Sequence, residues 1–173
     1  MNLLEAFKKI STFVFDVDGV LTDGFLTILD DGQMVRRMNI KDGYALQMAI
    51  KQGYRIVIIT GGNSEAVRER LNRLGVQDVF IKVENKKNKL MEYMEQHELS
   101  RDEVLFMGDD IPDFTAMQIA GLACAPGDAA PEIKTISNYI SGIKGGYGCV
   151  RDVIEKVLKL NDHWPMETTV RSK

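Results

Sequence analysis

Two acidic residues placed one residue apart, Asp16 and Asp18, are the side chains of this sequence best suited to chemistry. They follow an apolar run at 13–15, and Gly19 comes directly after them. An apolar run of this length, ended by Asp and Gly, predicts a buried strand that enters a turn. Ligands of open α/β sheets bind beyond the carboxyl ends of such strands. Two acids there repel each other unless a cation or a shared proton compensates, so the pair indicates a ligand site.

Two other interpretations fit parts of this stretch. The first is a strand end with two solvated aspartates in a turn, which the stretch alone leaves open. The second is a calcium loop, which needs oxygen ligands at alternating positions and a Glu at the twelfth. The twelfth position counted from Asp16 is Thr27, so the calcium interpretation fails.

Three further predicted strands are followed by polar groups that could join the two acids. These are Thr60 and Gly61 after the strand at 55–59, Lys86 in the segment after 79–81, and Asp109 and Asp110 after 104–107. The carboxyl ends of parallel strands share one edge of a sheet, so we expect these groups to converge. Each alone has a plainer explanation, as a turn, as part of a solvated lysine run or as a helix cap. Together and in this order, each after a strand, they favour one site.

The combination of three carboxylates, a hydroxyl and a lysine suits a phosphate group beside Mg²⁺. Mg²⁺ binds carboxylate, water and phosphate oxygens, and lysine gives the phosphate a positive point charge. N–H groups at the start of a helix bind the phosphate oxygens. A carboxylate can also attack phosphorus to give an aspartyl-phosphate. A second carboxyl two residues away could then protonate the leaving alkoxide and later activate water.

Strands and helices alternate along the whole chain, which predicts an α/β fold with a doubly wound, mainly parallel sheet. Between 25 and 38, two apolar runs flank an Asp-Asp-Gly turn, a strong signal for a β-hairpin. We expect this hairpin to stand beside the carboxyl end of the first strand. Residues 1–160 are predicted to form a single domain. Residues 161–173 are polar and are predicted to form a tail that is mobile, at least in a monomer.

The composition restricts the class of protein. With 45% hydrophobic and 27% charged residues, the chain is typical of soluble globular proteins. The net charge of −3 gives no broad basic surface for nucleic acid. The two cysteines, Cys124 and Cys149, form no disulfide framework and fit a reducing compartment. No stretch has the pattern of a signal peptide or a membrane span, so we expect a cytoplasmic protein without a membrane partner.

The ordered set of polar residues resembles the motifs of the haloacid dehalogenase-like (HAD) phosphohydrolases. The stretch 16–20, Asp-Val-Asp-Gly-Val, matches the first motif and Thr60-Gly61 the second. Lys86 matches the third motif, and 108–113, Gly-Asp-Asp-Ile-Pro-Asp, the fourth. The first and fourth motifs are specific, whereas the other two are weak unless these place them. The resemblance implies a Mg²⁺-dependent phosphatase with a Rossmann-like core.

The resemblance also implies a role for each matched residue. It implies that Asp16 is the nucleophile and Asp18 the general acid and base. It implies a metal site formed by the side chains of Asp16 and Asp109 with the backbone carbonyl of Asp18, and a phosphoryl site formed by Thr60, Gly61 and Lys86. Asp110 and Asp113 would position the lysine or the waters on the metal.

Too few residues separate Asp18 from the predicted strand at 55–59 to form a large cap domain. The chain therefore resembles the capless branch of the family. Within that branch it is similar to the family of 3-deoxy-D-manno-octulosonate 8-phosphate (KDO 8-phosphate) phosphatases. This resemblance rests on 16–24, 39–44 and 108–113, and it implies hydrolysis of KDO 8-phosphate to KDO in lipopolysaccharide sugar biosynthesis. The implied substrate contacts are Asp18, Asn39, Ile40, Lys41, Asp42, Gly43, Arg70 and Lys86.

The same resemblance implies a homotetramer, in which the hairpin and a neighbour's tail cover the active site in place of a cap. One position departs from the pattern. Many relatives have Arg after Thr-Gly, and those that act on nine-carbon sugar acid phosphates have Glu, whereas this chain has Gly62. The absence of Glu argues against a nine-carbon substrate. The absence of Arg makes Arg70 the better candidate for binding the carboxylate of a sugar acid.

Three alternatives stay open at this point. The chain could be a phosphatase of the same branch that acts on a nine-carbon sugar acid 9-phosphate or another small phosphate ester. It could be a phosphate-receiving signalling domain, which also places acids, Thr and Lys at strand ends, or an inert homologue. The pair Asp16 and Asp18 favours an enzyme, because a second carboxyl promotes hydrolysis of an aspartyl-phosphate that a signalling domain must keep.

Overall fold

A parallel sheet forms the centre of the computed structural model, which describes residues 2–171. Its strands are β1 (Thr12–Phe15), β4 (Arg55–Ile59), β5 (Asp78–Phe80), β6 (Val104–Met107), β7 (Leu122–Ala125) and β8 (Tyr139–Ile140). They lie in the order β5-β4-β1-β6-β7-β8, and every neighbouring pair is parallel. The chain starts in the middle and moves outward first to one side and then to the other. The predicted doubly wound α/β fold is confirmed, and the described residues include no large cap domain.

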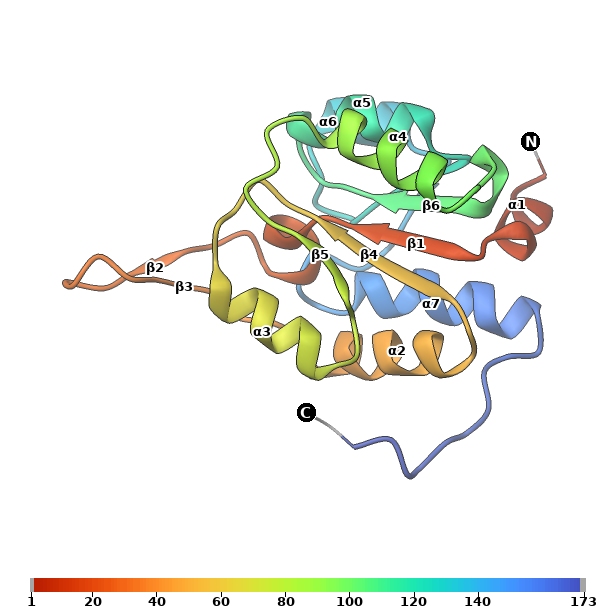
Figure 1. The fold of residues 1–173 in the computed structure, drawn as a ribbon, viewed down its shortest axis with the longest axis horizontal. Coiled ribbons are helices and arrows are strands. Elements are labelled where there is room, and N and C mark those ends of the chain that lie inside the picture. The colour runs from red at the N-terminus through yellow and green to blue at the C-terminus, as the bar shows by residue number, and fades with distance from the viewer. Residues whose placement is uncertain (1, 172–173) are drawn as a thin grey trace.

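Helices cover both faces of the sheet (Figure 1). They are α1 (Leu3–Lys9), α2 (Ile40–Lys51), α3 (Glu65–Arg73), α4 (Lys86–Gln96), α5 (Phe114–Ile119), α6 (Pro131–Ile136) and α7 (Cys149–Leu160). The buried side chains of α1, α2, α3 and α7 pack on one face, and those of α4, α5 and α6 pack on the other. Within residues 2–171, no helix is both long and apolar enough to cross a membrane.

The first strand is buried on both faces, which explains its continuous apolar run. Phe13 and Phe15 belong to the core under α2 and α7, whereas Val14 belongs to the core under α4 and α5. Because successive side chains of a strand point to opposite faces, a polar residue in β1 would be buried in one of the two cores. The carboxylates of Asp16 and Asp18 therefore come only where the strand ends.

The predicted hairpin is confirmed as β2 (Thr27–Ile28) and β3 (Met34–Val35), which pair antiparallel. It projects away from the body of the protein (Figure 1). A β-bridge between Thr22 and Met38 closes its base, so the hairpin begins directly after the acidic turn. The hairpin thus stands beside the carboxyl end of β1, as predicted.

The tail makes contacts that the sequence did not predict. Trp164 packs edge-on against Tyr44 of α2, with ring centroids 5.9 Å apart, and Val170 also packs against the main core. The Tyr44 hydroxyl donates to the carbonyl of Glu167 at 2.8 Å, and the Glu167 carboxylate pairs with Lys51. These contacts lay residues 161–171 along α2 of the same chain. Residues 172–173 lie outside the described residues.

A glycine loop packs directly on the acidic turn and holds it in place. The N–H of Gly146 donates to the carbonyl of Val20 at 2.9 Å, and the N–H of Gly145 donates to Asp128 at 2.9 Å. A Cβ atom on Gly145 would overlap the carbonyl oxygen of Gly19. The φ angle of Gly145 is not positive, so close approach rather than backbone conformation requires glycine here.

We expect Gly145→Ala to lower the free energy of unfolding by about 1–3 kcal/mol, because the added methyl must push the two loops apart. Urea unfolding would measure this as a lower midpoint with an unchanged slope. Gly142→Ala is the matched control, since a Cβ at Gly142 has no neighbour within 4 Å. Equal midpoints for the two variants would contradict the expected overlap.

Candidate active site

The residues predicted from strand ends do converge in one pocket of about 330 Å³ at the carboxyl edge of the sheet. It is lined by residues that follow β1, β4, β5 and β6, as the parallel topology requires. The predicted residues among its lining are Asp16, Asp18, Thr60, Gly61, Lys86, Asp109, Asp110 and Asp113. Loops from elements far apart in sequence therefore build a single site.

The turn after β1 brings the first two acids and Asp109 together. Asp16 is extended like the strand, and the chain then turns at Gly19, whose φ is +87°. A Cβ atom on Gly19 would overlap the carboxylate of Asp109. Glycine is thus required twice at this position, once for its backbone conformation and once for the approach of Asp109.

Lys86 is buried between two of the acids. It is the first residue of α4 and is only 6% exposed. Its Nζ atom lies 2.9 Å from Oδ1 of Asp16 and 2.6 Å from Oδ1 of Asp113. Burial lowers the pKa of Lys86, but the two carboxylates more than offset this, so the ammonium form is favoured.

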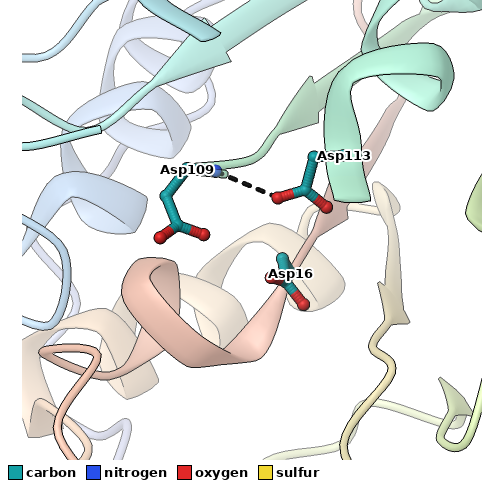
Figure 2. Close-up of side chains that lie close together, drawn as sticks. All are labelled: Asp16, Asp109 and Asp113. Atoms are coloured by element: carbon teal, nitrogen blue, oxygen red, sulfur yellow. Dashed lines mark hydrogen bonds between the residues drawn. The ribbon is translucent and has the colours of Figure 1, made fainter. Parts of the chain in front are cut away.

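Both carboxylate oxygens of Asp113 already have partners. Oδ1 accepts from Lys86, and Oδ2 accepts from the backbone N–H groups of Asp109 at 3.0 Å and Asp110 at 3.5 Å. Figure 2 shows the bond between Asp109 and Asp113. Asp113 therefore positions the lysine and the loop, and Asp110 caps the following turn through the N–H of Ile111.

Three carboxylates lie close together with too little positive charge between them. Oxygens of Asp16, Asp109 and Asp113 lie within 4.8 Å of one another (Figure 2). Burial, and then the charge of Asp113, raise the pKa of Asp16 to about 6. Burial, and then the charges of Asp16 and Asp113, raise the pKa of Asp109 to about 8.

These residues fit a divalent cation. The Oδ1 atom of Asp16 is buried, and its only close polar partner among the described residues is the ion-paired ammonium of Lys86 at 2.9 Å, so its acceptor capacity is not exhausted. Asp109 lies against the turn that carries Asp18 and Gly19, on the same side of the pocket. Hard oxygen donors of this kind are the ligands of Mg²⁺, and its charge would relieve the repulsion that raises both pKa values.

Thr60 lies at the end of β4 with its side chain buried. Its Oγ1 atom accepts a hydrogen bond from the N–H of Gly62 at 3.1 Å. The hydroxyl hydrogen can therefore point into the pocket, beside the backbone of Gly61 and Gly62. This arrangement offers donors to the oxygens of a phosphate group.

Asp18 is held by an arginine that the sequence did not single out. Nε of Arg36 lies 2.7 Å from Oδ1 of Asp18, and Nη2 lies 3.2 Å from Oδ2. Arg36 follows β3, so the hairpin reaches back to the acidic turn. The sequence predicted that the hairpin would stand beside the acidic turn. It did not show which of the two neighbouring arginines, Arg36 or Arg37, points toward Asp18.

The other predicted substrate residues do not line this pocket in the single chain. Asn39 caps α2 through the N–H of Lys41, and Lys41 lies in a separate hollow beside Tyr147. Asp42 is buried, accepts from the N–H of Arg151 at 2.8 Å, and has its pKa raised by burial to about 6. Nη2 of Arg70 lies beside Gly43. Contacts of the stretch 39–43 and of Arg70 with a substrate stay predictions.

The chain matches the family of haloacid dehalogenase-like hydrolases over residues 39–126. It is 31% identical over 151 residues to the 3-deoxy-D-manno-octulosonate 8-phosphate phosphatase KdsC of Escherichia coli K12, with 87% of this chain and 80% of that protein covered.

Solved structures agree with this match. The phosphatase of the same name from Moraxella catarrhalis, solved with magnesium, phosphate and KDO, has a TM-score of 0.90 and 30% identity, covering 94% of this chain and 95% of that one. The cobalt-bound deoxy-D-mannose-octulosonate 8-phosphate phosphatase of Haemophilus influenzae has a TM-score of 0.86 and 25% identity, covering 91% and 92%.

The raised pKa values predict how a cation changes stability with pH. Because the pKa values of Asp16 and Asp109 exceed the ordinary carboxyl value of 3.8, the folded state binds more protons than the unfolded state above that pH. Without a cation, stability therefore falls as the pH rises from about 4 through 6 and on to 8. We expect Mg²⁺ to raise the melting temperature at pH 8 and to raise it less at pH 6.

Asp109→Asn separates this effect from general salt effects. Without Mg²⁺ at pH 8 the variant should melt higher than the wild type, because a repelling charge is gone, and Mg²⁺ should raise its melting temperature little. Asp102→Asn, an exposed site at the opposite edge of the sheet, should respond to Mg²⁺ like the wild type. A wild type that does not respond to Mg²⁺ at pH 8 would contradict the metal site.

Proposed function

The chain belongs to the haloacid dehalogenase-like hydrolases and is a phosphoric monoester hydrolase, and we propose that its substrate is a sugar acid phosphate, KDO 8-phosphate. The products are KDO and phosphate, in lipopolysaccharide sugar biosynthesis. The observation that carries this proposal is the convergence of two acids, a buried lysine and a threonine hydroxyl in one pocket. The similarity to phosphatases named for this substrate supports the choice among sugar acids.

Asp16 is the proposed nucleophile. Its carboxylate attacks phosphorus, so a bond from Asp16 to phosphorus forms as the bond from phosphorus to the sugar oxygen breaks. Lys86, 2.9 Å from Asp16, lies where it can bind a phosphoryl oxygen, and the Thr60 hydroxyl and the N–H of Gly61 face the same space. Mg²⁺, held by Asp16, Asp109 and the Asp18 carbonyl, would neutralise charge on the phosphoryl group when bound.

Asp18 is the proposed general acid and base. Its side chain is 38% exposed, at the mouth of the pocket, where the leaving oxygen of the sugar must lie. It gives a proton to that oxygen in the first step. In the second step it takes a proton from water, which attacks phosphorus and releases Asp16 and inorganic phosphate. Both steps need the carboxyl of Asp18 to exchange part of its contact with Arg36.

Other phosphate esters could be hydrolysed by the same chemistry, and the main alternative substrate is a longer sugar acid. A sugar acid 9-phosphate with nine carbons carries the same two anionic groups. Gly62 gives that longer sugar no acidic partner at this position. We therefore rank it second, together with other small phosphate esters.

A kinetic comparison tests the substrate. We expect kcat/KM with Mg²⁺ to favour KDO 8-phosphate over nine-carbon sugar acid 9-phosphates and simple sugar phosphates by about a hundredfold, equal to near 3 kcal/mol in transition-state binding. The reason is that only the matching sugar acid places its phosphate on Asp16 and its carboxylate on a cation together. Similar low rates on all substrates would reject KDO 8-phosphate but keep the phosphatase chemistry.

Asp16→Asn is the control for that chemistry. The variant keeps the shape of the side chain and loses the attacking charge, so turnover should fall below detection while the circular dichroism spectrum is unchanged. Asp102→Asn makes the same substitution at an exposed site away from the pocket and should keep full activity. Substantial Mg²⁺-dependent hydrolysis by Asp16→Asn would contradict the nucleophile.

We also propose that the protein is a cytoplasmic homotetramer. Both cysteines are buried and unpaired, which fits the cytoplasm, and cell fractionation would test this. The hairpin presents apolar side chains to solvent, among them Phe25 at 79% and Ile28 at 70% exposed. Apolar residues gathered on a projecting element favour contact with another copy. The tail of a neighbouring copy would then cover the pocket. For this, the end of that tail must give up its contacts with α2 of its own chain.

Charges on the hairpin test the assembly. Phe25→Asp combined with Ile28→Asp should convert the tetramer to smaller species in analytical ultracentrifugation and should lower kcat/KM, because the cover of the pocket comes from a neighbour. Leu4→Asp, at an exposed apolar residue of α1, should keep the wild-type mass. A wild type that sediments as a monomer would reject the tetramer.

A further inference from the structure

Arg36 is a largely buried cation in a narrow hollow beside the active-site pocket, and its partners do not exhaust its hydrogen-bonding capacity; the hollow shares Asp18, Thr60 and Gly62 with the pocket. The side chain of Arg36 is 9% exposed, whereas that of Arg37, the next residue of the hairpin, is 80% exposed. Its Nε and Nη2 atoms bind the two oxygens of Asp18, and Nη1 donates to the carbonyl of Met34 at 3.5 Å. Within residues 2–171, these bonds use three of the five N–H donors of the guanidinium group. One N–H on each terminal nitrogen remains.

The end of the guanidinium group, the edge opposite its stem, carries the N–H of Nη2 that Asp18 does not use and one N–H of Nη1. That edge has the spacing that binds both oxygens of a carboxylate. Asp18 occupies the side edge, so a second carboxylate can bind the end edge without displacing it completely. Arg36 can therefore hold a protein acid and a ligand acid together.

Gly62 leaves open the space next to this guanidinium group. A Cβ atom on Gly62 would lie 3.6 Å from Nη2 of Arg36 and 3.5 Å from Oδ2 of Asp18. The φ angle of Gly62 is not positive, so the backbone does not require glycine. Any side chain longer than alanine would have to share this space with Arg36. Because Gly62 lines the active-site pocket, the absence of a side chain there leaves only the backbone of Gly62 between the pocket and Nη2 of Arg36.

Lys86 and a bound Mg²⁺ would face the phosphate group, so the charge of the pocket favours a further cation beside a second acid group of the substrate. Six carboxyl groups line the pocket, and Lys86 is the one ammonium among its lining residues. Lys86 lies at the bottom, between Asp16 and Asp113. A phosphate ester that also carries a carboxylate meets unfavourable charge at the mouth unless a cation is placed there.

We propose that Arg36 is a specificity-determining residue that binds the carboxylate of the sugar acid through the end edge of its guanidinium group while Asp18 keeps part of its contact with Arg36. The proposal rests on the proposed function, since it names the partner of the acid group of that substrate. It assigns to the hairpin a direct part in the choice of substrate.

The test compares two substrates that differ in the acid group. KDO 8-phosphate carries a carboxylate, and D-arabinose 5-phosphate does not. Arg36→Met should raise KM for KDO 8-phosphate and lower the ratio of the two kcat/KM values by about tenfold or more, because a charge-assisted bidentate contact is lost. Arg36→Lys should give a ratio between those of the wild type and Arg36→Met, because lysine keeps the positive charge but lacks the paired N–H donors of the guanidinium group. Arg37→Met is the matched control on the hairpin and should keep the wild-type ratio.

A binding measurement separates recognition from an effect on Asp18. Free KDO has the carboxylate but no phosphate, so its inhibition constant should rise about tenfold in Arg36→Met and stay unchanged in Arg37→Met. An equal loss of kcat/KM on both substrates, with an unchanged inhibition constant, would overturn the proposal, because Arg36 would then act only through Asp18. A wild type without preference for KDO 8-phosphate would overturn the proposed substrate. A strong wild-type preference that Arg36→Met retains would overturn only the role of Arg36.

Discussion

The ion pairs of Lys86 with Asp16 and Asp113 are the interaction on which the rest of the site depends. A buried carboxylate is costly unless it is paired or hydrogen-bonded. One ammonium serves two carboxylates here, at 2.9 and 2.6 Å. Asp113 is completed by backbone N–H groups of the loop after β6. Because Lys86 begins α4 and Asp16 ends β1, the pairs connect one helix, one strand and one loop at a single point.

The compensation of charge is incomplete, and this is what makes the site chemically useful. Asp109 has no cation of its own among the described residues, and burial with neighbouring charges raises its pKa to about 8. A site whose charges were all satisfied would gain little from binding a cation. Here the folded protein carries an electrostatic cost that a bound cation would relieve.

Most of the fold and the centre of the site could be predicted, because both follow from local patterns and one rule of topology. Apolar runs located the strands, and parallel strands bring their carboxyl ends to one edge, so Asp16, Thr60, Lys86 and Asp109 had to converge. The hairpin followed from its turn residues. These features depend on short stretches that can be interpreted without knowing how distant elements pack.

The features that escaped prediction depend on packing between distant elements. Trp164 finds Tyr44 only after α2 and α7 have packed side by side, which 161–173 does not encode locally. The direction of Arg36 depends on the twist of the hairpin against the body.

The hairpin connects an exposed apolar tip to the acidic turn of the pocket. Successive residues of an extended strand point to opposite sides, and Arg36 and Arg37 accordingly bind different acids, Asp18 and Asp23, of the same turn. The base of the hairpin is therefore joined to the acidic turn by two ion pairs, while its tip exposes apolar side chains to solvent. Only the inner of these two arginines reaches the pocket's acid Asp18, whereas the outer one pairs with Asp23 and stays exposed. The position of the Asp18 side chain is thus set by a residue outside its own turn, at the point where the hairpin returns to the body of the protein.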